Sequence, residues 1–262
     1  MFKINELQSI AYNYLFAVIY GLLLWHEPFS IHSYTSKPWF DLAIVVGIFF
    51  IITFFLMSKS TLNAGVSITA VASRMSVVIP VIAGIIILGD QLNPLKVSGI
   101  LLAVFSFYLI FKRKVSMKIK WKNMLLPFLL FLGIGFNDAM MKYIEEIYLV
   151  SDETMFLTVV FFIAFLISLL VIIFQIISGF DKFSWKSIVA GFILGSLNFG
   201  STYYFIMSMT VFDSSFLFPV FNGSVVVLTS FIGFAVFKEK LSKVNWLGIG
   251  IALIAILLIT IA

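Results

Sequence analysis

The sequence predicts an all-α protein that crosses a membrane many times, and two observations support this fold class. Hydrophobic residues make up 62% of the chain and charged residues 11%, whereas soluble domains are roughly 45–50% apolar and about 25% charged. The chain also repeats itself, because residues 65–110 return 149 residues later as 214–259 without a gap. A duplicated run of apolar helices is typical of polytopic membrane proteins.

Each copy of the repeat contains a long apolar helix, a polar turn and a second apolar helix that contains glycine. The matched positions are Gly84 and Gly233, Asp90 and Glu239, Leu92 and Leu241, Gly99 and Gly248, Ile100 and Ile249, and Ala103 and Ala252. The match continues upstream of residue 65, so the duplicated unit also includes the preceding helix.

Nine stretches are long and apolar enough to be predicted as membrane-spanning helices. A helix needs about 20 residues to cross roughly 30 Å of hydrocarbon. The stretches are 8–26, 39–58, 65–89, 95–111, 124–148, 154–178, 187–209, 214–237 and 244–262. The first is interpreted as a retained helix and not as a signal peptide, because its apolar run is long and does not end in small residues. The loops are short, so a function must be built between the helices.

The helix count predicts an unequal division of the chain. The first repeat, 1–113, holds four helices, a basic linker follows at 114–123, and the second repeat, 124–262, holds five. The first repeat therefore lacks the counterpart of the helix at 124–148. Either the protein has nine helices, or its start lies upstream and one helix is missing from the sequence. We favour the second interpretation, because a two-fold repeat without that helix would leave its central cavity open to lipid.

The distribution of positive charge predicts the orientation. Lys and Arg residues on one side of the predicted helices number thirteen, six of them between 112 and 122, whereas the other side carries only Lys37 and Lys96. The positive-inside rule therefore places the basic loop 112–122 in the cytoplasm and the C-terminus outside. We expect an integral protein of a bacterial cytoplasmic (inner) membrane, in which the basic loop anchors the topology and contacts lipid headgroups.

Residues 74–111, RMSVVIPVIAGIIILGDQLNPLKVSGILLAVFSFYLIF, carry a central proline, an acidic residue at the turn with leucine two places on, and a final helix that begins near a glycine. This stretch resembles the signature of EamA-like transporters in the drug/metabolite transporter superfamily, and residues 214–259 match it similarly. The resemblance implies ten helices in two inverted five-helix repeats, with a substrate cavity between them that opens alternately to each side. The chain departs from that pattern in its missing first helix and in the orientation that its charges predict.

The resemblance implies a secondary transporter of a small metabolite, such as an amino acid, a sugar, a nucleotide derivative or a drug-like solute. The chain lacks an ATP-binding GxxxxGK[ST] motif, so the expected driving force is an ion or solute gradient. The alternative is a flippase for a lipid-linked sugar or phosphate. An integral-membrane enzyme is less favoured, because GxSxG, HExxH and clustered carboxylate motifs are absent, so we predict that the protein is not an enzyme.

Three ionisable residues lie well inside apolar segments, where a charge is expensive unless it is paired or hydrated. They are Arg74, Asp138 and Lys142. The four-residue spacing places Asp138 and Lys142 on one helix face, where they form either a structural ion pair or a coupling carboxylate with a releasable partner. Arg74 either extends toward a membrane face or pairs with Asp138, or it contacts an anionic group of the substrate.

Helix-breaking residues form a second set of candidates. Pro80 and Pro219 each free a backbone carbonyl, while Asn222 and Gly223 interrupt the second copy where Arg74 lies in the first. Unpaired backbone must face protein or water inside a membrane, so these helices are either cavity walls or simply kinked for packing.

Polar side chains of the seventh segment form a third set, namely Asn198, Thr202 and Tyr204. They either bind substrate or hold helices together. Asp90 and Glu239 are expected to organise their turns and to cap the following helix. His26 and His32 lack a carboxylate cluster, so no metal site and no cofactor are predicted. The expected partners are a small-molecule solute and membrane lipid, with a homodimer as a candidate assembly and no nucleic acid.

Overall fold

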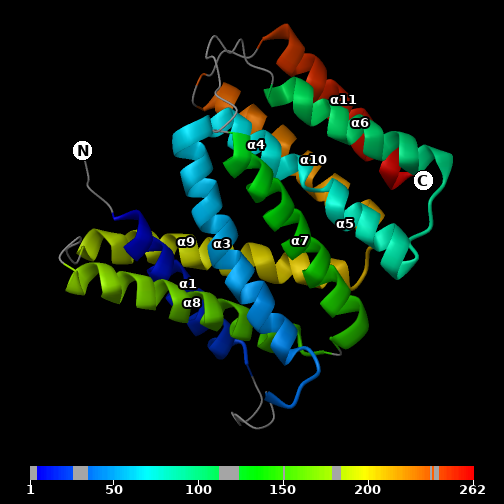
Figure 1. The fold of residues 1–262 in the computed structure, drawn as a ribbon. Helices are drawn as coiled ribbons and strands as arrows, with labels where there is room; N and C mark the ends of the chain where they lie inside the picture. Colours follow the sequence, from blue (N-terminus) through cyan, green and yellow to red (C-terminus); the bar gives the residue numbers. More distant parts are fainter. Residues whose placement is uncertain are drawn as a thin grey trace. The chain divides into compact units, whose positions relative to one another are not determined.

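A computed structural model of the protein describes residues 5–25, 35–111, 124–149, 151–178, 184–236, 238 and 242–262. The regular structure in these residues is entirely helical (Figure 1). The helices are α1 (Glu6–Leu23), α3 (Phe40–Ala64), α4 (Val66–Met75), α5 (Val78–Ala83), the π-helix η1 (Gly84–Leu88), α6 (Pro94–Phe111), α7 (Leu125–Tyr148), α8 (Glu153–Ile177), α9 (Trp185–Met209), α10 (Ser214–Ala235) and α11 (Lys243–Thr260). The predicted all-α class is confirmed.

The described helices occupy all nine predicted segments, since α4, α5 and η1 together fill the third. The largest difference is at the end of α3, which runs to Ala64 where the prediction stopped at residue 58. Two polar side chains explain the extension. Thr61 donates to the carbonyl of Met57 and Asn63 to that of Lys59, each at 2.8 Å, so these residues are compatible with a continuing helix.

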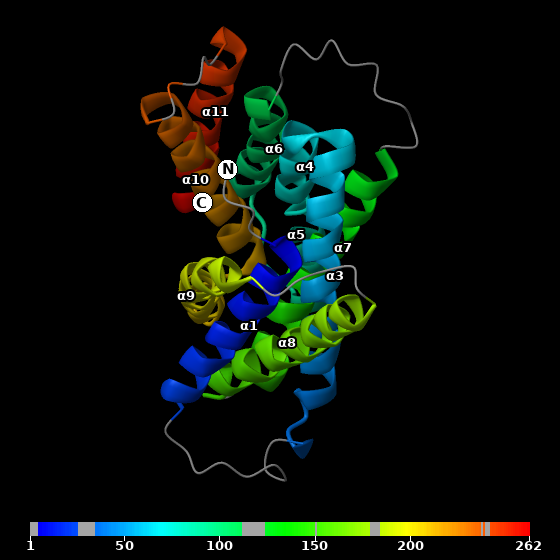
Figure 2. The same cartoon turned by 90° about the vertical axis from the view of Figure 1, so that its left-hand side faces the viewer.

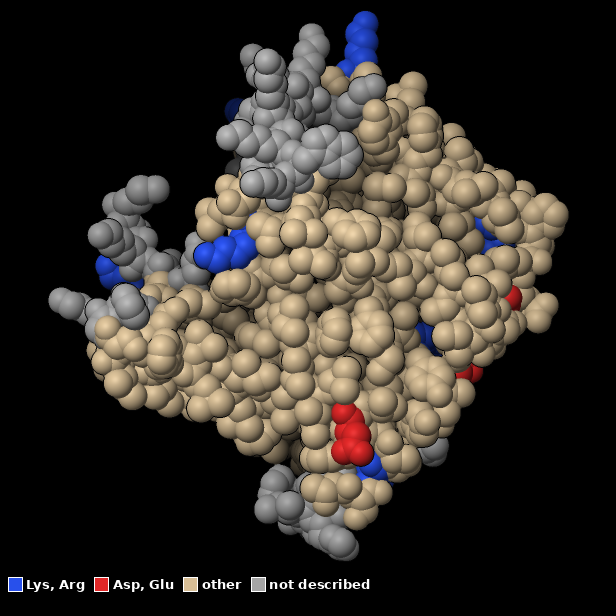
Figure 3. All heavy atoms as spheres, in the orientation of Figure 1, with Lys and Arg blue, Asp and Glu red and all other residues tan. Residues whose placement is uncertain are grey.

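The length and apolar character of the helices fit a membrane protein. Six helices of the described chain are long and apolar enough to cross a bilayer, and shorter apolar helices lie at Leu7–Leu23 and Pro94–Ile110. Figure 3 shows one face of the molecule, on which charged side chains are few among uncharged ones. An exterior of this kind is suited to lipid and not to water.

The third segment is broken at two places. Pro80 has no N–H, so the carbonyl of Ser76 instead accepts from the N–H of Ile79, at 2.9 Å. The helical segment then widens into η1 and ends before Gly89. The φ of Gly89, +77°, lies in the left-handed region that favours glycine. By contrast, α10 continues through Pro219.

The described helices group into two compact units, which are considered separately. Unit 1 contains residues 1–52 and 144–210, and unit 2 contains residues 53–143 and 211–262. Unit 1 thus holds α1, α8, α9 and the first half of α3. Unit 2 holds the broken third segment, α6, α10, α11, the rest of α3 and most of α7. Each unit draws helices from both halves of the chain.

Glycines allow the helices of unit 1 to pack closely, and Figure 2 shows α1 beside α8 and α9. A Cβ atom added at Gly195 would lie 2.6 Å from the carbonyl oxygen of Asn13, and one added at Gly47 would lie 2.8 Å from that of Val160. The first contact joins α9 to α1, and the second joins α3 to α8. Buried aromatic rings, including those of Tyr14 and Phe161, fill the space between these helices.

In unit 2, α6 and α11 run side by side (Figures 1 and 2). A Cβ atom at Gly99 would lie 2.6 Å from Cγ1 of Ile259, and one at Gly248 would lie 2.8 Å from Cγ1 of Ile110. Gly248 and Ile259 stand 149 residues after Gly99 and Ile110. The same contact therefore occurs twice with the roles exchanged, as at a two-fold axis.

Candidate functional site

A hydrogen bond between α4 and α10 forms the centre of the candidate site. In unit 2, Arg74 donates from Nη1 to Oδ1 of Asn222 at 3.0 Å. Asn222 is 7% exposed and donates from Nδ2 to the carbonyl of Phe218, also at 3.0 Å. Because the amide nitrogen is engaged within α10, the amide oxygen faces the guanidinium. Arg74, which is half-buried, thus points toward the second copy of the repeat.

Asp138 of α7 adds a negative charge to this pair. It is half-buried and attracts Arg74 electrostatically, at longer range than a direct ion pair. Three helices of unit 2 therefore contribute one polar residue each. Lys142 follows four residues later on the continuous helix α7, so it lies on the same face as Asp138, as the spacing predicted. Its side chain is buried, at 3% exposed.

The helix-breaking residues lie close to these groups along the chain. Gly223 is the repeat counterpart of Arg74, and a Cβ atom there would lie 3.3 Å from the side chain of Ile256. Pro80 and Pro219 are both buried. The structure places Pro80 on the wall of a cavity, as described below, and Pro219 inside the unbroken α10.

The polar residues predicted on the seventh segment belong to unit 1. Asn198 donates from Nδ2 to Oδ1 of Asn13 at 3.2 Å, and Thr202 donates to Oδ1 of Asn198 at 3.5 Å. These mutual hydrogen bonds join α9 to α1 and fit the packing interpretation of the two residues. Tyr204 does not join them, since its side chain is 73% exposed.

Two cavities lie between the third segment and α7, both within unit 2. The larger, about 650 Å³, is lined entirely by apolar residues of α4 and of the start of α7, including Val71, Ala72, Met75, Phe128 and Phe131. The smaller, about 340 Å³, lies between α5, η1 and the C-terminal half of α7. Between the two cavities along α7 lies Gly135. The side chain of Ile79 of α5 packs against Gly135 so closely that a Cβ atom there would collide with it.

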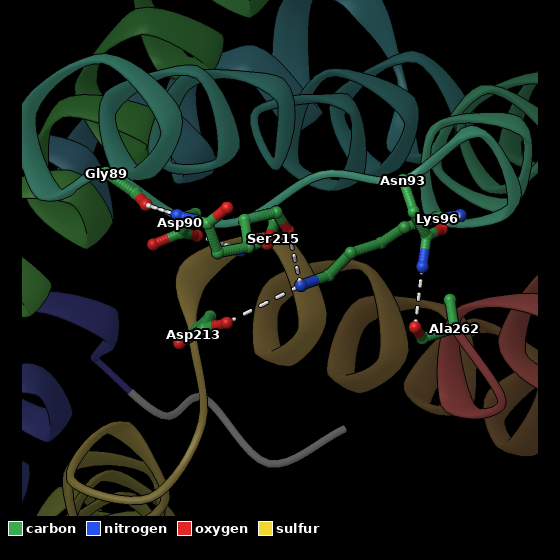
Figure 4. Close-up of polar contacts among 8 residues, drawn as sticks. Gly89, Asp90, Asn93, Lys96, Asp213, Ser215 and Ala262 are labelled. Carbon is green, nitrogen blue, oxygen red and sulfur yellow. Dashed lines mark hydrogen bonds and ion pairs between the residues drawn. The ribbon is translucent and has the colours of Figure 1, made fainter.

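The start of α10 is fastened to the turn before α6 by two contacts that the sequence did not predict. The carboxylate of Asp90 accepts from the backbone N–H of Ser215 at 2.7 Å, and Nζ of Lys96 lies 3.5 Å from Oδ2 of Asp213 (Figure 4). We call these four residues the clasp. Lys96 also donates to the carbonyl of Gln91 at 3.2 Å.

The clasp corrects one expectation about Asp90. Asp90 does cap a helix, but that helix is α10 and not the following α6. The cap of α6 is Asn93, whose Oδ1 accepts from the N–H of Lys96 at 2.7 Å. The left-handed Gly89 turns the chain so that Asp90 reaches α10. Its counterpart Glu239 lies outside the described residues, as do His26, His32 and the basic loop 112–122.

Metal binding has no support in the described part of the chain, where no three His, Cys, Asp or Glu side chains gather closely enough to hold an ion. The sequence predicted neither a metal nor a cofactor.

Comparison with known proteins identifies the family. The model of the EamA-like transporter family matches residues 2–112 and 121–261. An uncharacterised protein of Haemophilus influenzae is 26% identical over 260 residues, which are 95% of this chain and 86% of the relative.

A protein of known crystal structure has the same fold, with a TM-score of 0.76 at 12% identity, over 98% of this chain and 89% of its own. The family and the helical architecture together confirm the predicted class of a polytopic membrane protein with two inverted repeats. The chain therefore belongs to the EamA-like transporter family of integral membrane proteins.

Proposed function

We propose that the protein is a secondary transporter that moves a small metabolite across the bacterial cytoplasmic membrane by alternating access between its two repeats. The observation that supports this proposal is the convergence of Arg74, Asn222 and Asp138 from three helices of unit 2. Among the described residues, Arg74 contacts a neutral amide oxygen and no carboxylate, so direct contact with them does not neutralise its charge. Its other N–H donors suit an anionic group such as a carboxylate or a phosphate.

Asp138 gives this site a means of coupling. An anionic solute at Arg74 would approach the carboxylate of Asp138, and the two negative charges would compete for one guanidinium. A proton on Asp138 removes that competition, so proton binding and solute binding favour each other. By linkage, each increases the affinity for the other by the same factor. A proton gradient can then drive accumulation of the solute.

Asp138→Asn tests the coupling, because asparagine keeps the size of the side chain but cannot exchange a proton. We expect proteoliposomes with this variant to lose uptake driven by a pH gradient while still binding solute. Radiolabelled amino acids, sugars and nucleotides would be offered as a panel, and an internal pH dye would follow proton movement. Asp41→Asn, at an exposed acid in the first turn of α3, is the matched control. Gradient-driven uptake that equals the wild type in Asp138→Asn would reject the proposal.

The larger cavity favours a flippase for a lipid-linked sugar or phosphate as the second candidate. Its lining is wholly apolar, and Ala72 and Met75 on its wall flank Arg74 in the sequence of α4. A lipid tail could occupy such a groove while its phosphate contacts the guanidinium. Proteoliposomes that move a fluorescent phospholipid between leaflets, but take up no solute of the panel, would favour this function over solute transport.

A further inference from the structure

The contact between η1 and the first turn of α10, here called the seam, is closer than side chains would allow. A Cβ atom added at Gly84, the first residue of η1, would lie 2.5 Å from Cβ of Ser214 and 2.6 Å from Oδ2 of Asp90. Carbon atoms in contact lie about 3.5–4.0 Å apart. The two elements therefore meet this closely because residue 84 has no side chain, and the clasp lies beside their contact.

The closed seam leaves the hydroxyl of Ser214 buried without a partner. This side chain is 1% exposed, and its Oγ has no hydrogen-bond partner among the described residues. A serine inside a helix can donate to the carbonyl four residues earlier, but Ser214 is the first residue of α10 and has no helical turn before it. Water would hydrogen-bond to this hydroxyl in an open seam, so its burial opposes closure.

The clasp supplies contacts that favour closure, and one of them is exposed. Asp90 accepts from the N–H of Ser215 at 2.7 Å (Figure 4). Nζ of Lys96 lies 3.5 Å from Oδ2 of Asp213, whose side chain is 59% exposed, and an exposed ion pair stabilises a protein only weakly. These contacts are opposed by the unpaired hydroxyl at the same place. Opposing effects of similar size are the condition for two populated states.

The backbone beside the seam has the irregular geometry that a moving segment needs. In place of a regular α-helical end, the N–H of Asp90 donates to the carbonyl of Gly84 at 3.1 Å. The π-helix η1 is followed by Gly89 in the left-handed region, with a φ of +77°. Short π-helices are frequent at functional sites, and hinges are often small residues at the ends of elements. A conformational change at η1 and Gly89 would move the turn that carries Asp90 relative to α10.

We propose that the clasp is a latch, which exchanges in the folded protein between the closed arrangement of this structure and an open one in which η1 and α10 part and water reaches Ser214. The latch joins the first repeat, through Asp90 and Lys96, to the second, through Asp213 and Ser215. It lies on the side that the charge count assigns to the outside. Its role rests on the proposed transport function and deepens it, because alternating access requires that side to close and open in turn.

A single introduced thiol measures the opening, because the chain contains no cysteine. Ser215→Cys is the reporter, since residue 215 is 0% exposed and its hydroxyl has no partner among the described residues, so the thiol replaces no hydrogen bond. Protein in nanodiscs would be treated with a water-soluble maleimide, and mass spectrometry would give the labelling rate. This rate follows the open fraction when closing is faster than labelling. Ser98→Cys, at an exposed residue of α6, gives the rate for an uncovered thiol.

Substitutions at the seam, each combined with the reporter, should change this rate in opposite directions. Gly84→Ala places a methyl group in the seam and should speed labelling about 5-fold or more, the effect expected of overpacking. Ser214→Ala removes the unpaired hydroxyl that opposes closure and should slow labelling about 5–30-fold. Asp213→Asn breaks the exposed ion pair and should speed labelling by up to about 5-fold.

Two substitutions elsewhere in unit 2 are matched controls and should leave the rate unchanged. They are Gly250→Ala, where a Cβ atom meets nothing within 4 Å, and Ser230→Ala, whose hydroxyl donates to the carbonyl of Val226. Circular dichroism would show that each variant is folded. If Gly84→Ala does not fold, the opposite effects of Ser214→Ala and Asp213→Asn still test the latch.

A reporter thiol that stays unlabelled in the folded protein would overturn the latch and leave the clasp as a purely structural contact. A labelling rate that Ser214→Ala and Asp213→Asn do not change would overturn it as well. No solute is needed for these measurements. Failure of the latch is therefore distinct from failure of transport, which the uptake experiment with Asp138→Asn tests.

Discussion

Arg74 marks one position at which the two copies of the repeat differ. Its counterpart in the second copy is Gly223, so the repeat carries a positive charge once and a small residue once. The guanidinium reaches Asn222, the neighbour of its own counterpart. One copy thus supplies the charge and the other its acceptor.

The hydrogen bond between these residues predicts the effect of Asn222→Ala. Arg74 would lose its acceptor, and we expect the free energy of unfolding to fall by about 1–2 kcal/mol, measured by chemical unfolding in detergent. Asn63→Ala removes an exposed amide that bonds within α3 and should change stability little. Asn222→Asp keeps an acceptor for Arg74, loses the donor to the carbonyl of Phe218 and adds a negative charge, so it should weaken binding of an anionic solute. Equal stability of Asn222→Ala and Asn63→Ala would contradict the assigned contact.

The sequence identified several residues of the candidate site but not their contacts. Arg74, Asp138 and Asn222 stand out because polar groups are costly in apolar segments. Their association depends on how α4, α7 and α10 pack, which local sequence does not determine. The clasp was missed for the same reason, because it joins the turn before α6 to the start of α10, which lie far apart in the sequence.

At the scale of helices, the sequence predicted positions well and local geometry less well. Apolar runs are set by the thickness of the membrane, so all nine segments were found. Pro80 indicated the break in the third segment through its missing N–H. The π-helix η1 was not predictable from local preference, because it begins at Gly84, which packs against Ser214 and Asp90, and tertiary packing brings these residues together.

The paired helices α6 and α11 predict opposite effects for two nearby glycines. A Cβ atom at Gly248 would lie 2.8 Å from the backbone nitrogen of Ile110, which cannot move easily, whereas one at Gly250 meets nothing within 4 Å. Gly248→Ala should therefore destabilise the protein by about 1–3 kcal/mol. Gly250→Ala should be neutral or stabilise it by up to about 1 kcal/mol, since alanine favours a helix. Unfolding in detergent would compare the two, and equal effects would refute this packing of α6 on α11.

At the scale of the whole molecule, the described contacts agree with the alternation of loops that the sequence predicts. In unit 1, Lys37 and Asp152 form an ion pair at 2.8 Å, and both belong to loops assigned to the outside. Also in unit 1, the N–H of Ser184 donates to Gln8 at 2.8 Å, and both lie on the side assigned to the cytoplasm. In unit 2, Asn93 donates to the carbonyl of Ala262, again between segments assigned to one side. Each contact joins segments on the same predicted side.

Which side faces the cytoplasm follows from the thirteen positive charges against two, and a labelling experiment tests that prediction. The chain contains no cysteine, so a single introduced thiol reports its own position. Ser151→Cys, at an exposed residue between α7 and α8, should react with a membrane-impermeant maleimide in intact cells. Trp185→Cys, at a 75% exposed residue on the opposite predicted side, should react only after lysis. The reverse pattern would show that the positive charges do not set the orientation, and it would place the clasp, which the charge count assigns to the outside, in the cytoplasm.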